Sequence, residues 1–215
     1  MKTLWAEAVG TFFLFATVIG SGVLAQQLGG GDVLLGVLVV TLATVMMLQL
    51  LVTMLGPVSG AQFNPVVSLV VRLRGGNSTA GMLAMVAVQV AAGVAAVLCV
   101  HAMYGLPVLQ VATNARGGFG LMLGEFVATF GLILTVLLTG RHKPEAGATS
   151  VALYIGAAIL FTSSTCFANP AITIARALTD SFTGIAPAHV PGFIAAQFAG
   201  GLAAHWLDRV IYPES

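Results

Sequence analysis

Two Asn-Pro pairs carry the clearest chemical signal in the sequence. Asn64-Pro65-Val66 and Asn169-Pro170-Ala171 each open a helix-forming run that is too short to cross a bilayer. Pro suits the first turn of a helix because it has no N–H to lose, and the preceding Asn can cap that turn. A helix that begins inside a membrane exposes unpaired N–H groups and partial positive charge, which is tolerated where the helix lines a cavity. The amide NH2 groups of both Asn residues are therefore expected to meet a solute oxygen near the membrane midplane.

Composition restricts the class of protein. The chain has 215 residues, of which 58% are hydrophobic and 7% charged, and this excludes an ordinary soluble domain. A net charge of +1 gives no reason to expect a nucleic-acid partner. The sequence contains no nucleophile with a base and an orienting acid, no metal-ligand spacing and no phosphate-binding loop. We expect no enzyme, catalytic residue, cofactor or metal.

Hydropathy predicts an all-α membrane protein with six transmembrane helices and two re-entrant half-helices. Each of the six segments is long enough to cross roughly 30 Å of hydrocarbon, whereas the Asn-Pro runs are not. The four histidines lie near segment ends or in a loop, so we expect them at the membrane interface. The six predicted spans are approximately 4–28, 33–55, 80–104, 119–139, 149–163 and 190–211.

The two halves of the chain resemble each other. Residues 6–19 and 124–137 share Glu, Val, Thr and Phe at matching positions, and Gln89 with Gly93 is echoed by Gln197 with Gly201. We expect one domain over 1–215, with repeat one at about 1–105, repeat two at about 119–215 and a linking loop at 106–118. Because each half has three spans, the halves must be inverted, and the two Asn-Pro runs enter from opposite sides.

The positions of Lys and Arg predict the orientation. Placing both termini in the cytoplasm puts most of the basic residues there as well, as the positive-inside rule requires. The residues assigned to the cytoplasmic side are Lys2, Arg72, Arg74, Arg141, Lys143 and Arg209, and those assigned outside are Arg116 and Arg176.

Glu7 and Glu125 are carboxylates in matching positions near the starts of two predicted spans. Acidic residues inside a membrane are functional candidates by default. In the structural interpretation, each carboxylate accepts hydrogen bonds from the backbone of the re-entrant run in its own half. In the alternative, the two acids relay protons in a coupled transporter.

The segments AEAVGTFFL, SGAQFNPVV, AVQVAAG, GEFVATF, FANPA and AAQFAGG occur in this order along the chain. In these segments the sequence resembles the aquaporin and aquaglyceroporin channels (major intrinsic proteins). The resemblance implies two half-helices that together complete a seventh span, one pore per subunit and a homotetramer. It also implies an integral protein of the lipid bilayer, in the inner membrane of a bacterium.

Departures from the family pattern indicate the solute. Val66 stands where Ala is usual, Gln62 where His is frequent, and Ile172 where most members have Arg. By spacing from the Asn-Pro boxes, the resemblance implies an outer constriction whose side chains are small or apolar. Such a ring is expected to be wide and poor in hydrogen-bond donors. We expect passive diffusion of water and of larger neutral solutes, such as glycerol-like polyols or metalloid hydroxides. The four positions are Thr44, Ala157, Cys166 and Ile172.

Arg176 lies four residues after Ile172, on the same helix face and about 6 Å farther along the axis, toward the outer vestibule. It could act at the pore mouth, pair with Asp180, or extend toward the interface. Residues 169–180 and 182–193 are similar to a bacterial subgroup often associated with arsenic-resistance genes, which implies undissociated arsenite and methylated trivalent arsenicals. The Cys166 thiol could meet such solutes, or could simply be a small apolar lining residue.

Two other functions stay open at this point. A proton-coupled secondary transporter of a small solute would use Glu7 or Glu125 during its cycle. A membrane adhesion or scaffold protein would conduct nothing, and would leave the paired Asn-Pro boxes unexplained.

Overall fold

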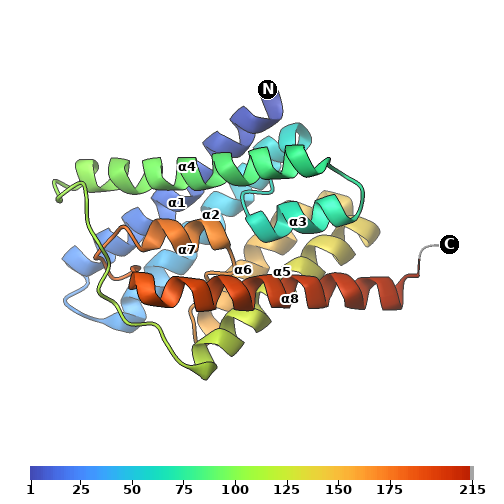
Figure 1. Cartoon of the computed structure of the whole chain (residues 1–215). Helices are drawn as coiled ribbons and strands as arrows, with labels where there is room; N and C mark the ends of the chain where they lie inside the picture. Colours follow the sequence, from blue (N-terminus) through green and yellow to red (C-terminus); the bar gives the residue numbers. More distant parts are fainter. Residues whose placement is uncertain (214–215) are drawn as a thin grey trace.

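A computed structural model of the chain describes residues 1–213, and all regular elements in that part are helical (Figure 1). The expected all-α membrane fold is confirmed. The elements are α1 (Lys2–Leu28), α2 (Val33–Ser59), α3 (Pro65–Leu73), α4 (Thr79–Met103), α5 (Phe119–His142), η1 (Pro144–Ala146), α6 (Gly147–Phe161), α7 (Pro170–Arg176), η2 (Pro187–His189) and α8 (Val190–Ile211).

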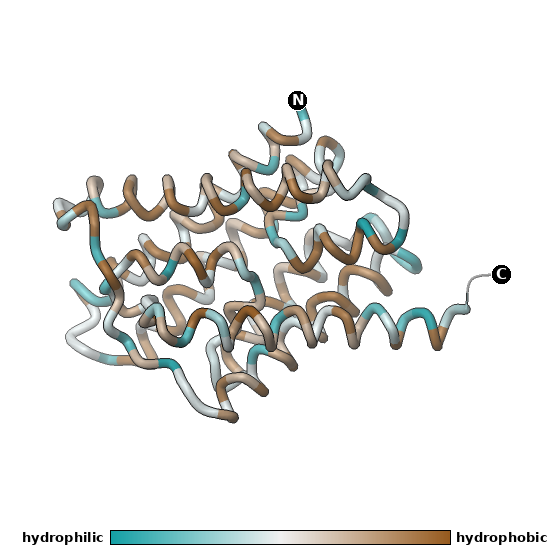
Figure 2. Tube along the Cα trace, viewed as in Figure 1, coloured by the Kyte–Doolittle hydropathy of each residue, from teal (hydrophilic) through white to brown (hydrophobic). Residues whose placement is uncertain are grey.

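The long helices occupy the positions predicted for the six spans. Five helical segments in the described part are long and apolar enough to cross a membrane, and mean hydropathy reaches 2.5 in α2 and α4. The sixth predicted span is α8, which has 22 residues but a more polar composition. Hydrophobic residues dominate the helices, and hydrophilic ones gather at helix ends and connecting segments (Figure 2).

The two short helices, α3 and α7, begin at the prolines of the two Asn-Pro boxes. Asn64 and Asn169 are their N-caps, and each adopts the extended backbone conformation typical of that position. Both short helices lie between α4 and α8 (Figure 1), and they contact each other as well as these two neighbours. The half-helices therefore meet inside the bundle.

Glycine permits close packing where Val66 is buried. A Cβ atom added to Gly201 of α8 would lie 2.2 Å from Cγ1 of Val66, which is impossible without movement. Val66 is fully buried and packs with Ile133 of α5. The extra bulk at this position, where Ala was the family expectation, is thus accommodated against α8.

The segment between α4 and α5 is tied across the end of α7. The N–H of Ala112 donates to the carbonyl of Ala177 at 2.9 Å. Both the N–H and the hydroxyl of Thr113 donate to Oδ1 of Asp180 at 2.8 Å, and these bonds hold the pKa of Asp180 below its usual range. Asn114 donates its amide to the carbonyl of Ser181 at 2.6 Å. The predicted linker is therefore a fixed part of one end of the bundle.

His101 belongs to the same end and lies in the last turn of α4, as expected, but its ring is enclosed by protein. The ring is fully buried, with Nδ1 2.8 Å from the carbonyl oxygen of Val108 and Nε2 2.9 Å from the hydroxyl of Thr179. Because a carbonyl oxygen only accepts, Nδ1 must carry a proton. His101 fastens the linker to the segment that follows α7.

Candidate functional site

A cavity of about 370 Å³ runs lengthwise between the helices. Its lining residues on α2 extend from Val33 to Val52, a stretch of about 28 Å at helical rise. This length is close to the roughly 30 Å thickness of the bilayer hydrocarbon. We call the end bounded by Phe182 and Thr183 the loop end, and the end bounded by Gly140 and Gly147 the opposite end.

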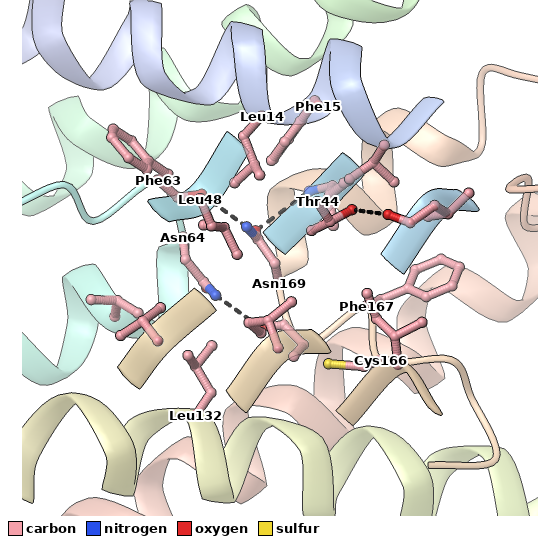
Figure 3. A pocket seen from close by; sticks show the side chains of 18 of the residues that line it. Leu14, Phe15, Thr44, Leu48, Phe63, Asn64, Leu132, Cys166, Phe167 and Asn169 are labelled. Atoms are coloured by element: carbon pink, nitrogen blue, oxygen red, sulfur yellow. Dashed lines mark hydrogen bonds between the residues drawn. The ribbon is translucent and has the colours of Figure 1, made fainter. Parts of the chain in front are cut away.

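Hydrogen bonds join the two Asn-Pro boxes in the middle of this cavity (Figure 3). The amide nitrogen of Asn64 donates to the carbonyl of Ala168, and that of Asn169 donates to the carbonyl of Phe63, both at 2.8 Å. The side-chain oxygen of each Asn accepts from the first turn of its own half-helix, for example from the N–H of Val66 at 2.9 Å. One N–H of each amide is thus used within the protein, which leaves one on each residue for a solute.

Left-handed backbone precedes each box. In the described chain, the non-glycine residues with positive φ are all in these two loops, and Phe63 and Ala168 occupy matching positions immediately before the asparagines. This conformation costs on the order of 1–3 kcal/mol per residue and persists where the surroundings fix it. The five residues are Ala61 (47°), Phe63 (47°), Thr165 (60°), Cys166 (50°) and Ala168 (47°).

Glu7 fixes the first loop. Its two carboxylate oxygens accept from the N–H groups of Gln62 at 2.9 Å and Phe63 at 2.8 Å. The hydroxyl of Ser59 and the amide of Gln89 donate to the same carboxylate at 2.7 and 2.9 Å. Glu7 is fully buried, and four donors satisfy its charge.

Glu125 fixes the second loop in the same way. Its oxygens accept from the N–H groups of Phe167 at 2.9 Å and Ala168 at 2.8 Å, and from the amide of Gln197 at 2.6 Å. Gln197 also donates to Thr173 of α7 at 2.9 Å, as Gln89 does to Ser68 of α3. Apart from the Ser59 hydroxyl, which only Glu7 binds, the matched carboxylates and glutamines hold both re-entrant loops by corresponding contacts.

These contacts determine where the loop carbonyls point. In a trans peptide the C=O is directed opposite to the N–H, and no cis peptide occurs in the described chain. The N–H groups of both loops point toward the buried carboxylates. The carbonyls of the same peptide units therefore point away from the carboxylates and toward the cavity. The residues that carry these carbonyls are Ala61, Gln62, Cys166 and Phe167.

The facing wall of the cavity is apolar. Helices α2, α5 and α6 contribute aliphatic side chains along most of its length. Leu48 and Leu132 lie on two sides of the asparagine pair (Figure 3). A solute in the cavity therefore meets hydrogen-bonding groups on one side and hydrocarbon on the other. The aliphatic residues of this wall include Val37, Val40, Leu48, Leu132, Val136, Ile155 and Ile159.

Three of the four predicted constriction residues line the cavity, and one does not. Thr44, Cys166 and Ile172 are buried in its wall. Ala157 is exposed on the outer face of α6. The prediction for Ala157 is wrong because the helix turns about 100° per residue, and the face of α6 toward the cavity carries Ile155 and Ile159 instead.

Arg176 also lines the cavity, at its loop end. The side chain is buried, its Nε donates to the carbonyl of Thr183, and its guanidinium lies over the ring of Phe167 at 3.4 Å from the centroid. The alternative pairing with Asp180 is not formed, because Asp180 binds Thr113 instead. The four side chains of the predicted ring are uncharged. The cavity wall near Ile172 nevertheless carries the charge of Arg176.

Arg116 is a lining residue that the sequence reasoning missed. It lies in the linker, donates from Nε to the carbonyl of Gly184 at 2.8 Å, and lies 5.2 Å from the centroid of Phe167. Phe167 itself was also missed, although its place between Cys166 and Asn169 could have indicated it. No sequence signal indicated Arg116, because its position beside the cavity depends on how the linker folds.

Comparisons with known proteins identify the family of the chain. Residues 1–168 match the model of the family described as major intrinsic protein. The chain is 45% identical over 204 residues to the aquaglyceroporin AqpS of Rhizobium meliloti (strain 1021), covering 95% of this chain and 87% of that protein. It is 27% identical over 217 residues to the aquaporin NIP1-4 of Oryza sativa subsp. japonica, covering 98% and 77%.

The fold also has a solved counterpart. The X-ray structure of the aquaglyceroporin from Plasmodium falciparum superposes with a TM-score of 0.73 at 19% identity, covering 99% of this chain and 97% of that one. At this identity the likeness concerns the fold alone. The family match and the bacterial relative also bear on function. Together with the membrane-length helices and the cavity, they support a channel for small solutes. The chain belongs to the major intrinsic protein family.

Proposed function

We propose that this protein is a passive channel for small uncharged solutes larger than water, of the glycerol-like polyol class. The observation that carries the proposal is the two-sided wall of the cavity. The loop carbonyls and the free N–H of each central Asn offer acceptors and donors on one side, opposite an aliphatic surface. A polyol matches this wall because its hydroxyl groups can lie along one edge and its C–H groups along the other.

The side chains at the predicted ring support a solute larger than water. Thr44, Cys166 and Ile172 carry small or aliphatic side chains, and the hydroxyl of Thr44 already donates to the carbonyl of Val40 at 2.7 Å. Water entering this region loses hydrogen-bond partners, whereas a polyol gains contact with hydrocarbon. Undissociated metalloid hydroxides have hydroxyl groups in a similar compact arrangement, and we include arsenite and methylated trivalent arsenicals in the proposed solute class.

The alternative of a proton-coupled transporter finds little support at the two acids. Glu7 and Glu125 are fully buried, hydrogen-bonded to loop N–H groups, and absent from the described cavity wall. A carboxylate that gained a proton would lose acceptor capacity for these donors and release the loop. Each acid is better suited to hold the channel than to cycle during transport.

Two further expectations belong to the proposal. The matched contacts of Glu7 with Glu125 and of Gln89 with Gln197 are consistent with inverted repeats over about 1–105 and 119–215. We also propose a homotetramer in a bacterial inner membrane with both termini in the cytoplasm, as the basic residues predict.

Swelling of proteoliposomes tests the solute class. Purified protein is reconstituted, and the rate of light-scattering change is compared for water, glycerol, urea, erythritol and undissociated arsenous acid. We expect glycerol and arsenous acid to enter much faster than in empty liposomes, and erythritol to enter more slowly than glycerol. If only water moves faster, the proposed solute class is wrong.

A further inference from the structure

Arg176 has unused hydrogen-bond donors beside the cavity. A guanidinium carries five N–H groups, and in the described chain Arg176 uses only Nε–H, toward the carbonyl of Thr183. The side chain is only 5% exposed, yet it lines the cavity. Four donors of a permanently charged group are thus left beside the cavity without a protein acceptor among the described residues.

Arg116 adds a second guanidinium from a different element. Its Nε donates to the carbonyl of Gly184 at 2.8 Å and its Nη2 to that of Phe182 at 3.3 Å, which leaves three N–H groups. Burial lowers the pKa of Arg116 and attraction by Glu125 partly offsets this, but a guanidinium remains protonated at neutral pH. Asn114 anchors the linker beside Arg116. Its carbonyl accepts from the N–H of Ala186, and its side-chain amide donates to the carbonyl of Ser181.

Glu125 attracts both guanidinium groups, but neither group forms an ion pair with an acid among the described residues. Arg74 and Arg141 form ion pairs with Asp208, away from this cavity. Glu125 lies behind the backbone of Phe167 and is occupied by two loop N–H groups and Gln197. Asp180 is exposed and binds Thr113. The loop end of the cavity therefore carries two positive charges in contact with the same aromatic ring.

We propose that Arg116 and Arg176 form a binding site for a small oxyanion, such as a phosphate or a carboxylate, at the loop end of the cavity. Two planar guanidinium groups with free N–H donors suit the oxygen atoms of such an ion, which can accept two bonds at once. Phe167 keeps both groups in position, because each lies over or beside its ring.

A bound oxyanion is expected to stop at this site. Past Arg176 the cavity wall is largely aliphatic, and the N–H groups that open the half-helices already bind the side-chain oxygens of Asn64 and Asn169. Few groups there replace the hydration that a charged ion would lose, so its passage is costly. The anion would then obstruct the path of neutral solutes, a consequence that rests on the proposed channel function.

Equilibrium binding of radiolabelled inorganic phosphate to the purified full chain tests the site without any flux. We expect saturable binding of one phosphate per chain, weakened about tenfold in Arg116→Gln, since a lost charge-assisted donor pair changes affinity by this order. Arg116→Lys keeps the charge but not the planar fork, and should bind with intermediate affinity. Lys143→Gln removes an exposed charge next to α6 and should bind like wild type.

Two results would overturn the site: no saturable phosphate binding to the wild-type chain, or equal affinity in wild type, Arg116→Gln and Arg116→Lys. If Arg116→Gln does not fold, as judged by its elution and thermal transition, the comparison of wild type with Arg116→Lys decides. Obstruction is measured separately, as at least a twofold slowing of glycerol entry by phosphate relative to chloride at equal ionic strength. Binding without slowing refutes the obstruction, and absence of glycerol entry refutes the channel but not the site.

Discussion

Ile172 and Arg176 together define the chemistry near the loop end. Ile172 stands where the family resemblance implies Arg, and Arg176 lines the cavity one helical turn later, about 6 Å farther along the axis. The wall at Ile172 is therefore aliphatic, and the positive charge lies farther toward the loop end. If the proposed channel takes solutes larger than water, this separation lets it meet them with donors at the loop end and with hydrocarbon beside Ile172.

Replacing Ile172→Arg should reverse that separation. The longer side chain would occupy the space beside Thr44 and Cys166, and glycerol permeability should fall about tenfold, the effect of roughly 1.4 kcal/mol on a barrier. Water permeability should fall much less. Swelling rates of proteoliposomes measure both, with Ile172→Val as the matched control. A rise in glycerol entry would contradict the proposed role of Ile172.

Cys166 offers a chemical test of the wall. Its side chain is buried in the cavity lining, whereas Cys99 lies on α4 and is absent from the described lining. We expect a mercurial to stop most glycerol entry in the wild-type chain, and to have little effect on Cys166→Ser. Cys99→Ser is the control and should stay sensitive. Inhibition that persists in Cys166→Ser would place the reactive thiol elsewhere.

Individual site residues could be predicted from the sequence where a local motif fixes them. Asn64 and Asn169 follow from helix capping, and Cys166 and Ile172 lie within three residues of a box, so little can shift them. Ala157 lies twelve residues before Asn169 and across a helix end, and there the spacing gave the wrong face of α6. Arg116 depends on linker contacts with residues 177–186, which hydropathy and spacing do not encode.

At the element scale, the two re-entrant loops depend on one carboxylate each. Left-handed residues before each Asn turn backbone N–H groups inward, and Glu7 or Glu125 accepts them. The resulting direction of the carbonyls creates the polar side of the cavity. A structural acid thus determines the surface that the solute contacts, although it does not touch the solute itself.

Glu125→Gln should therefore damage the structure and the flux together. The substituted amide presents an NH2 group toward the N–H of Phe167 or Ala168, and a buried donor without an acceptor costs about 1–3 kcal/mol. We expect a lower thermal transition of the purified protein and slower glycerol entry. Glu145→Gln, at an exposed acid in η1, should change neither. A stable Glu125→Gln channel that loses only coupling to a pH gradient would favour the transporter alternative.

The helices themselves were predictable because hydrophobic length is a local property. All six predicted spans correspond to helices, and both half-helices begin at the expected prolines. The fixed linker was not predictable. Its hydrogen bonds join residues about 65 positions apart, such as Thr113 to Asp180 at a separation of 67, and the buried His101 is part of the same tertiary arrangement.

For the whole molecule, the distribution of hydrophobic residues indicates what surrounds the channel. Large apolar side chains are exposed on the outside of the bundle, for example Leu42 and Met46 of α2 and Leu153 of α6. The buried polar groups instead gather around the half-helices and loops. This arrangement suits a protein whose outer surface meets lipid or neighbouring subunits, and whose interior carries the solute path.

The proposed homotetramer can be measured on the intact protein. With a chain mass of 21.9 kDa, light scattering corrected for bound detergent should give a protein mass four times this value. Each chain contains its own cavity, so cross-linked tetramers should retain full glycerol permeability per chain. A mass equal to one chain under mild detergent conditions would contradict the tetramer while leaving the single-chain channel intact.

In the proposed channel, neutral solute moves passively through the cavity of one chain. Glycerol entry into proteoliposomes, measured against glycerol concentration with and without an imposed pH gradient, tests it most directly. We predict a rate that rises linearly with the glycerol gradient, depends weakly on temperature and is unchanged by the pH gradient. Accumulation of glycerol above its external concentration, driven by that gradient, would contradict the passive channel.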